Sequence, residues 1–481
     1  MAEVVSALSH ALDLSTGQPI GHSVRTCVLG MRIAHEIGLS GQLLNDLYYA
    51  LLLKDAGCSS NASLIFRTLN SDDLRAKRGV KTTDWTRLGS ESLQYALSNV
   101  AAGKPFLERV RTLVRLAATQ KQHARDVTKL RCERGASLAR LIGLREATAN
   151  GIASLDEHWD GSGNPDGLSG REIPLLSRIM LLAQTVEVFW AARSAERALE
   201  VAGDRSGRWF DPQLVKAVKS LNARGLLWEG FDLGDDFALA LQMDMEERTM
   251  IAGDATLDSI CLAFAQIVDA KSPFTYNHSN GVANAAVAIG QTLGFDRNRI
   301  LFLRHAALLH DLGKLGVSNA ILEKPDKLDD KEWQSLRLHP FHTWKVLRKI
   351  SGFDELSEVA ASHHEKLDGT GYFRGLTGQH MSLESRILVV ADMFDALSAK
   401  RPYRDALPNE KVFEIMRKDA PKALDFMCLE ALEHSGIGCD QTFVDLQTLS
   451  RRLSRLQFPP VSTEPEQSSA SVALSGTIKG N

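Results

Sequence analysis

The chain has 481 residues, of which 44% are apolar and 24% are charged, so a folded core is expected and a wholly disordered chain is excluded. Lysine plus arginine number 56 and aspartate plus glutamate 59, and a net charge of −3 argues against sequence-blind binding of nucleic acid. The most apolar stretch, residues 179–192, is interrupted by Gln184 and Glu187, so no membrane insertion is predicted. No signal peptide is recognisable and the six cysteines form no Cys-x-x-Cys pair, which predicts a cytoplasmic location.

Apolar residues recur at helical spacing along the chain, and long β-branched alternating runs are missing. This pattern predicts an all-α protein. Asp329 and Asp330 are expected to begin a helix, and Gly294 and Gly313 to end one. The segment 456–481 is rich in Ser, Pro, Gly and Thr and is expected to be a disordered tail.

An internal repeat divides the chain. The run beginning Gly21-His22-Ser resembles the run beginning Asn277-His278-Ser, and these histidines are 256 residues apart. The run beginning at Asp160 (DGSGNPDGLSG) resembles the run beginning at Asp368 (DGTGYFRGLTG), 208 residues later, so the first copy contains 48 extra residues, expected around 67–123. We therefore expect a domain at 1–228, a connecting segment at 229–256, a second domain at 257–455 and the tail.

Histidines cluster in the second copy, where 8 of the 14 fall between residues 278 and 380. Together with nearby aspartates they suit two divalent metal ions, with iron or manganese favoured and zinc, nickel or cobalt left open. A carboxylate such as Asp311 has two oxygens and is able to bridge two ions. Such a pair lowers the pKa of a water and neutralises phosphoryl oxygens, which predicts hydrolysis of a phosphodiester or phosphomonoester.

The second copy also carries longer motifs: His310-Asp311-Leu-Gly-Lys314, then His363-His364-Glu-Lys-Leu-Asp-Gly-Thr-Gly-Tyr372, then Asp392-Met-Phe-Asp-Ala-Leu and Arg401-Pro-Tyr-Arg404. Over residues 255–445 these motifs resemble the HD-GYP subgroup of the HD phosphohydrolase superfamily. The resemblance implies two tandem HD-type helical bundles and a metal-dependent phosphodiesterase. Its implied reaction is hydrolysis of cyclic di-GMP to pGpG, and in some members to GMP, in bacterial second-messenger signalling.

The resemblance also implies roles for individual residues. One metal ion would be held by His278, His310, Asp311 and Asp392; the other by Asp311, His339, His363 and His364. Asp311 and Lys314 would be catalytic, with Lys314 at the scissile phosphate. Tyr372 would border the guanine, and Arg401 and Arg404 would grip phosphate.

Two positions depart from the family pattern. Phe373 stands where the signature proline is expected, which is expected to affect the loop that recruits partners more than the metals. Phe274 stands where three-metal members carry a glutamate, so a binuclear centre is predicted.

The first copy keeps only His22 and Asp55 of the seven ligand positions, with Lys54 and Arg131 replacing two histidines, so it is expected to be non-catalytic. Its expected role is either to pack against the second copy or to dimerise, or else to bind cyclic di-GMP through Arg131 and Arg193.

For the whole chain, the open alternatives are a phosphohydrolase for another cyclic dinucleotide or nucleotide, a non-catalytic signalling scaffold, and a relic with an empty site. The partners implied are cyclic di-GMP, a diguanylate cyclase or other signalling protein, and a second copy of the chain.

Overall fold

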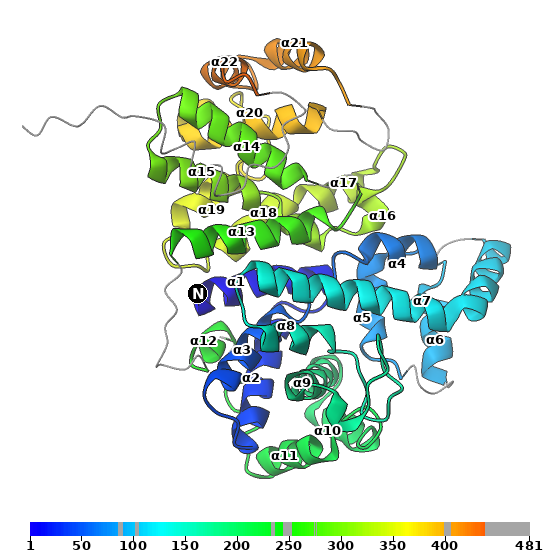
Figure 1. Ribbon diagram of the computed structural model, residues 1–481. Coiled ribbons are helices and arrows are strands. Elements are labelled where there is room, and N and C mark those ends of the chain that lie inside the picture. The colour runs from blue at the N-terminus through cyan, green and yellow to red at the C-terminus, as the bar shows by residue number, and fades with distance from the viewer. Residues whose placement is uncertain are drawn as a thin grey trace, which may run out of the picture. The chain divides into compact units, whose positions relative to one another are not determined.

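The computed structural model describes residues 1–84, 90–101, 105–231, 236–243, 253–273, 275, 277–398 and 406–437. Within these ranges the protein is all-α, as predicted: the described residues contain helices and two isolated bridges but no strand. Residues 1–443 form one compact unit (Figure 1). The predicted tail and the residues Phe274, Arg401 and Arg404 lie outside the described ranges.

Twelve α-helices and a short 3-10 helix precede the second copy in the described chain. They are α1(Ala2–Thr16), α2(His22–Glu36), α3(Gln42–Leu53), α4(Ala62–Leu69), α5(Asp73–Val80), α6(Ser90–Asn99), α7(Phe106–Leu141), α8(Glu146–Ala153), η1(Gly170–Glu172), α9(Leu175–Ala192), α10(Ala195–Asp204), α11(Pro212–Ala223) and α12(Asp236–Leu241). The last of these lies in the predicted connecting segment and packs against α1 and α2.

The second copy contains ten described α-helices and two 3-10 helices. They are α13(Asp254–Asp269), α14(His278–Thr292), α15(Arg297–Leu309), η4(Leu312–Gly316), α16(Asn319–Leu322), α17(Asp330–Arg337), α18(His339–Leu347), α19(Asp354–Ala360), η5(Gly378–His380), α20(Leu383–Ser398), α21(Asn409–Asp419) and α22(Phe426–His434). The expected helix start is found, because Asp329 caps α17 in a capping box with Glu332. Gly294 follows the end of α14 with φ 80°, a conformation that favours glycine. Gly313, however, lies inside η4 rather than at the end of α15.

The repeat seen in the sequence is present in the structure. Helices α2 and α14 both begin at the histidine of their copy and both have 15 residues. In each copy an aspartate in the last turn of the preceding helix accepts from the serine that follows the histidine: Ser23 Oγ lies 2.7 Å from Asp13, and Ser279 Oγ lies 2.7 Å from Asp269. Helices α4 and α5 stand where the second copy has α16 and α17, and Asp72 caps α5 as Asp329 caps α17. The first copy differs by an additional helical segment that includes α6 and the start of α7.

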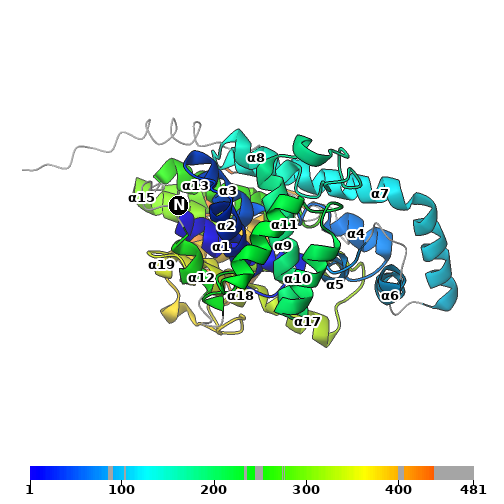
Figure 2. The same cartoon turned by 90° about the horizontal axis from the view of Figure 1, so that it is seen from below.

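Helix α9 is the centre of the first copy. Figures 1 and 2 show it beside α2 and α10, and it packs against both. By length and composition it is the one described helix apolar enough to cross a membrane, with a mean hydropathy of 1.4, but 72% of its residues are buried inside the protein. It has the burial of a core helix.

The two copies share buried polar contacts, which helix α5 supplies from the first copy. Asp73 accepts from the backbone N–H of Asn319 at 2.8 Å and lies 3.7 Å from the Lys271 ammonium. Lys271 is 1% exposed and also donates to the carbonyl of Leu315 at 3.0 Å. Helix α1 packs against η4 and α18. The loop that follows His310-Asp311 is therefore supported from both copies, while the predicted boundary between the two domains stays a prediction.

Candidate metal centre

The seven predicted metal ligands come from three helices of the second copy and from the residues that follow two others. His278 is the first residue of α14, His310 follows the last residue of α15, and His339 is the first residue of α18. His363 and His364 follow α19, and Asp392 lies in the middle of α20. Ligands at helix ends reach inward without interrupting the hydrogen bonds of a helix. The structure brings all seven together, as predicted.

The first group of ligands surrounds one oxygen of Asp311. Its Oδ2 lies 3.5 Å from His278 Nε2 and 3.3 Å from His310 Nε2. Asp392 Oδ1 lies 3.3 Å from His278 Nε2 and 3.8 Å from His310 Nε2. His278, His310 and Asp311 together form a set able to hold a metal ion.

The second group surrounds the other oxygen of Asp311. Its Oδ1 lies 3.4 Å from His339 Nε2 and 3.5 Å from His363 Nε2. His364 completes a second metal-binding set with these two histidines. The two oxygens of one buried carboxylate thus face two different histidine groups, which is the geometry that bridging requires.

Backbone carbonyls orient three of the histidine rings in the same way. The Nδ1 of His310 lies 2.7 Å from the carbonyl three residues earlier, and the same contact is 2.6 Å for His339 and 2.7 Å for His363. An Nδ1–H that donates to a carbonyl leaves the lone pair on Nε2, which is the nitrogen that faces Asp311. This arrangement fixes the ring tautomer before any ligand binds.

A carboxylate orients the fourth ring. Asp395 Oδ2 lies 2.6 Å from His278 Nδ1. The approach depends on Gly281, because a Cβ at that position would come within 1.7 Å of Asp395 Oδ1. A carboxylate behind a ligating histidine holds the ring and increases the basicity of the nitrogen that faces the metal.

The carboxylates make the site attractive to cations. Burial disfavours a proton on His278, but Asp311, Asp392 and Asp395 raise its pKa well above the ordinary value. Burial lowers the pKa of His363 to about 4, and the pKa of His339 lies well below its ordinary range for the same reason. These two rings are therefore neutral at neutral pH, as metal ligands must be.

Two atoms of the cluster test whether metal ions fit. His310 Nε2 and Asp311 Oδ1 are buried and have no hydrogen-bond partner among the described residues. Buried polar atoms are costly without a partner. A nitrogen lone pair and a carboxylate oxygen, both directed at the centre of a His and Asp cluster, are suitable donors to a transition metal.

Two further predicted residues border the cluster. Lys314 donates to Asp311 Oδ2 at 2.5 Å, and its side chain is 17% exposed. The ring of Tyr372 lies 4.7 Å from the ring of His364, and the guanidinium of Arg337 lies 5.4 Å from the Tyr372 ring. His364 is 28% exposed, so Lys314, Tyr372 and His364 mark the side that faces solvent.

The loop that carries Tyr372 is closed by Glu365. Its carboxylate accepts from the backbone N–H groups of Arg374 at 2.7 Å and Leu376 at 2.9 Å. Phe373 has φ 91°, which a proline ring cannot adopt. Its ring lies 5.8 Å from Phe341 and 6.1 Å from Trp344 on α18. The departure from the family motif therefore changes the loop backbone and packs a ring against α18.

Comparison with known proteins decides the family. The family described as HD domain matches residues 112–214 and 263–426, more than half of the chain. The chain belongs to the HD domain family. A 3'3'-cGAMP-specific phosphodiesterase 3 from Vibrio cholerae is 44% identical over 433 residues, which cover 90% of this chain and 94% of that protein.

Other relatives of this HD-domain protein are also phosphodiesterases. The crystal structure of V-cGAP3, a cyclic GMP-AMP specific phosphodiesterase of V. cholerae, has 38% sequence identity and a TM-score of 0.62, covering 90% of this chain and 97% of that one. The cyclic di-GMP phosphodiesterase response regulator RpfG of Xanthomonas campestris is 31% identical over 36% of this chain and 46% of its own. The predicted membership of the HD-GYP subgroup is confirmed, as is the HD-type all-α fold.

Sequence reasoning missed Asp395, although a signal was present. Asp395 follows Asp392 by three residues, which places both on one face of α20. It also has a counterpart 208 residues earlier, Glu187, which contacts His22 in the first copy. The repeat could therefore have identified it.

Proposed function

We propose that the second copy is a phosphodiesterase centre for a 3'3'-cyclic dinucleotide that uses two divalent metal ions, iron or manganese. The observation that carries the proposal is the position of Asp311, one oxygen of which faces His278 and His310 while the other faces His339 and His363. When bound, the ions would supply Lewis acidity toward phosphoryl oxygens and activation of water.

The residues of the chain then have separate tasks. His278, His310, Asp311 and Asp392 would hold one ion, and Asp311 with His339, His363 and His364 the other. Lys314 is a flexible cation at the exposed side of the centre, where its ammonium is positioned to balance charge on the scissile phosphate. The ring of Tyr372 and the guanidinium of Arg337 offer a stacking surface and a cation for a base and its phosphate.

The substrate proposed first is 3'3'-cGAMP. The V. cholerae relative that this chain matches over 94% of the relative's length is named as specific for that dinucleotide. The cyclic di-GMP implied by the HD-GYP motifs is the second candidate, supported by relatives such as RpfG. Both substrates contain the same 3'–5' phosphodiester and differ in one base. Hydrolysis of one such bond opens the ring to a linear dinucleotide, which is pGpG in the case of cyclic di-GMP.

The experiment is a turnover assay on the full chain with each cyclic dinucleotide and with manganese or ferrous iron, read out by separation of the linear products. Wild type is compared with Asp311→Asn and with Asp55→Asn, which alters the matching position of the first copy. We expect Asp311→Asn to lose at least about 10³-fold in turnover, since the bridging carboxylate serves both groups of ligands. Asp55→Asn should keep its turnover.

The relative kcat/KM of the two dinucleotides decides between the substrates. If the Asp311→Asn chain still hydrolyses both dinucleotides, the assignment of Asp311 as the metal bridge is contradicted. No turnover of either dinucleotide by metal-loaded wild type would favour the signalling scaffold instead.

A further inference from the structure

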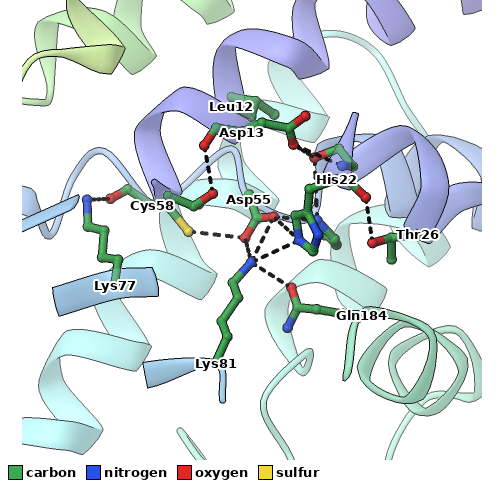
Figure 3. Close-up of polar contacts among 12 residues, drawn as sticks. Leu12, Asp13, His22, Thr26, Asp55, Cys58, Lys77, Lys81 and Gln184 are labelled. Carbon is green, nitrogen blue, oxygen red and sulfur yellow. Dashed lines mark hydrogen bonds and ion pairs between the residues drawn. The ribbon is translucent and has the colours of Figure 1, made fainter. Parts of the chain in front are cut away.

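The first copy contains a lysine in the position where the second copy would hold a metal ion. Lys81 follows the last residue of α5. Its ammonium lies 3.2 Å from His22 Nε2 and 3.1 Å from Gln184 Oε1. It also lies 3.1 Å and 3.2 Å from the two oxygens of Asp55 (Figure 3).

The three partners of Lys81 are the first copy's equivalents of three predicted metal ligands. By the repeat, His22 matches His278, Asp55 matches Asp311 and Gln184 matches Asp392. The orienting carboxylate is also kept: Glu187 matches Asp395, and it contacts His22 Nδ1 as Asp395 contacts His278 Nδ1. The ammonium therefore lies among residues that keep the histidine and the aspartate of this ligand group, with Gln184 in place of the second aspartate and Lys54 in place of the second histidine.

The chemistry of this shell fits an ammonium better than a divalent ion. An ammonium has three donors, and here the three acceptors are an imidazole, a carboxylate and an amide oxygen. The contacts of 3.1–3.2 Å are hydrogen-bond lengths, whereas a transition metal lies about 2.0–2.2 Å from nitrogen and oxygen ligands. Gln184 also replaces a carboxylate by a neutral amide, which lowers the negative charge to match a monovalent cation.

The protonation of His22 agrees with this arrangement. Burial and the Lys54 ammonium lower its pKa to about 4, against the opposing effect of Glu187. A neutral His22 that donates from Nδ1 to Glu187 has its lone pair on Nε2, and that atom faces Lys81.

In the first copy, the place that matches the second metal ion is also occupied by charged side chains of the chain itself. Arg131, which matches His339, forms an ion pair with Asp156, which matches His364. The same guanidinium lies 3.9 Å from Cys58 Sγ, at the position that matches Lys314. Only 11% of the Arg131 side chain is exposed. An arginine committed in this way is poorly placed to bind a nucleotide.

We propose that the first copy is a metal-free counterpart of the catalytic bundle in which the Lys81 ammonium takes the place of a metal ion. The end of α5 supplies this cation. The first copy is then stabilised from within the chain, while the second depends on ions from solution.

The first test measures stability. Lys81→Met keeps most of the apolar stem and removes the charge, which leaves Asp55 with one ammonium, that of Lys54, at its Oδ2. We expect the melting temperature of the full chain to fall by about 3–5 °C, because a buried ion pair loses one partner. The matched control is Lys129→Met, whose ion pair with Glu133 is 55% and 65% exposed and should shift the melting temperature by less than about 1 °C.

The second test measures metal content of the purified full chain by mass spectrometry of the elements. Asp55→Asn should contain the same number of metal ions per chain as wild type. Should Asp55→Asn prove unstable, the milder Gln184→Asn is analysed in the same way. A Lys81→Met chain as stable as wild type, or the loss of one metal equivalent in either first-copy variant, would overturn the proposal.

Discussion

The contact between Asp395 and His278 gives a prediction whose size follows from the structure. The two side chains are 19% and 3% exposed and lie 2.6 Å apart, so water does not easily replace the carboxylate. Loss of such a partner lowers metal affinity by about 10–100-fold. Asp395→Asn keeps an acceptor and loses the charge, so we expect about 10-fold; Asp395→Ala loses both, so we expect about 100-fold. These factors correspond to about 1.4 and 2.7 kcal/mol.

The assay is a titration of the chelator-treated full chain with manganese, followed by metal content and by turnover at each free metal concentration. At saturating metal the kcat of Asp395→Asn should approach that of wild type, because the change acts on His278 and not on the substrate. Glu187→Gln is the matched control, since it alters the same contact in the first copy. It should leave the metal titration unchanged.

Two results would refute this reasoning. An Asp395→Ala chain that binds manganese as tightly as wild type would show that the carboxylate does not support a metal ligand. A Glu187→Gln chain that loses as much affinity as Asp395→Ala would show that the effect is general destabilisation.

Three further predictions concern single residues. Gly281→Ala should weaken metal binding about as much as Asp395→Asn, measured by the same titration, because the added Cβ would come within 1.7 Å of Asp395 Oδ1; unchanged binding would mean that Asp395 tolerates displacement. Burial and Lys54 lower the pKa of His22 from 6.5 to about 4, so the unfolded chain takes up a proton first and the stability that His22 provides is lost as the pH falls from 6.5 to 4. The melting temperatures of wild type and His22→Gln should therefore converge between pH 7 and pH 5, and a constant difference would contradict a neutral His22. Glu365→Gln should raise KM more than it lowers metal affinity and should cost about 1–3 kcal/mol in the free energy of unfolding, because the loop of Tyr372 loses an acceptor; an unchanged KM would separate that loop from substrate binding.

The sequence was sufficient to predict the helical fold, the repeat and the convergence of seven ligands. These features rest on helical spacing, on motifs that recur in the same order in both copies, and on the resemblance of the second copy's motifs to a known family. Lys81 could not be predicted, because it matches none of the seven ligand positions and its contacts span 26 to 103 residues of sequence. The φ of 91° at Phe373 was equally inaccessible, since nothing in its neighbours requires a left-handed residue there. The bases of the substrate are not encoded in the metal-ligand motifs, so these motifs alone do not distinguish cyclic di-GMP from 3'3'-cGAMP.

Helix α5 connects the altered site of the first copy to the second copy. One end of this short helix places Lys81 among the remnants of the old site, and the other places Asp73 beside Lys271 and the backbone of Asn319. A chain without the first copy would lack the carboxylate that pairs with Lys271, whose ammonium donates to the carbonyl of Leu315, the residue after Lys314. Selection on the second copy would then also preserve the first, although the first keeps only two of the seven candidate ligands.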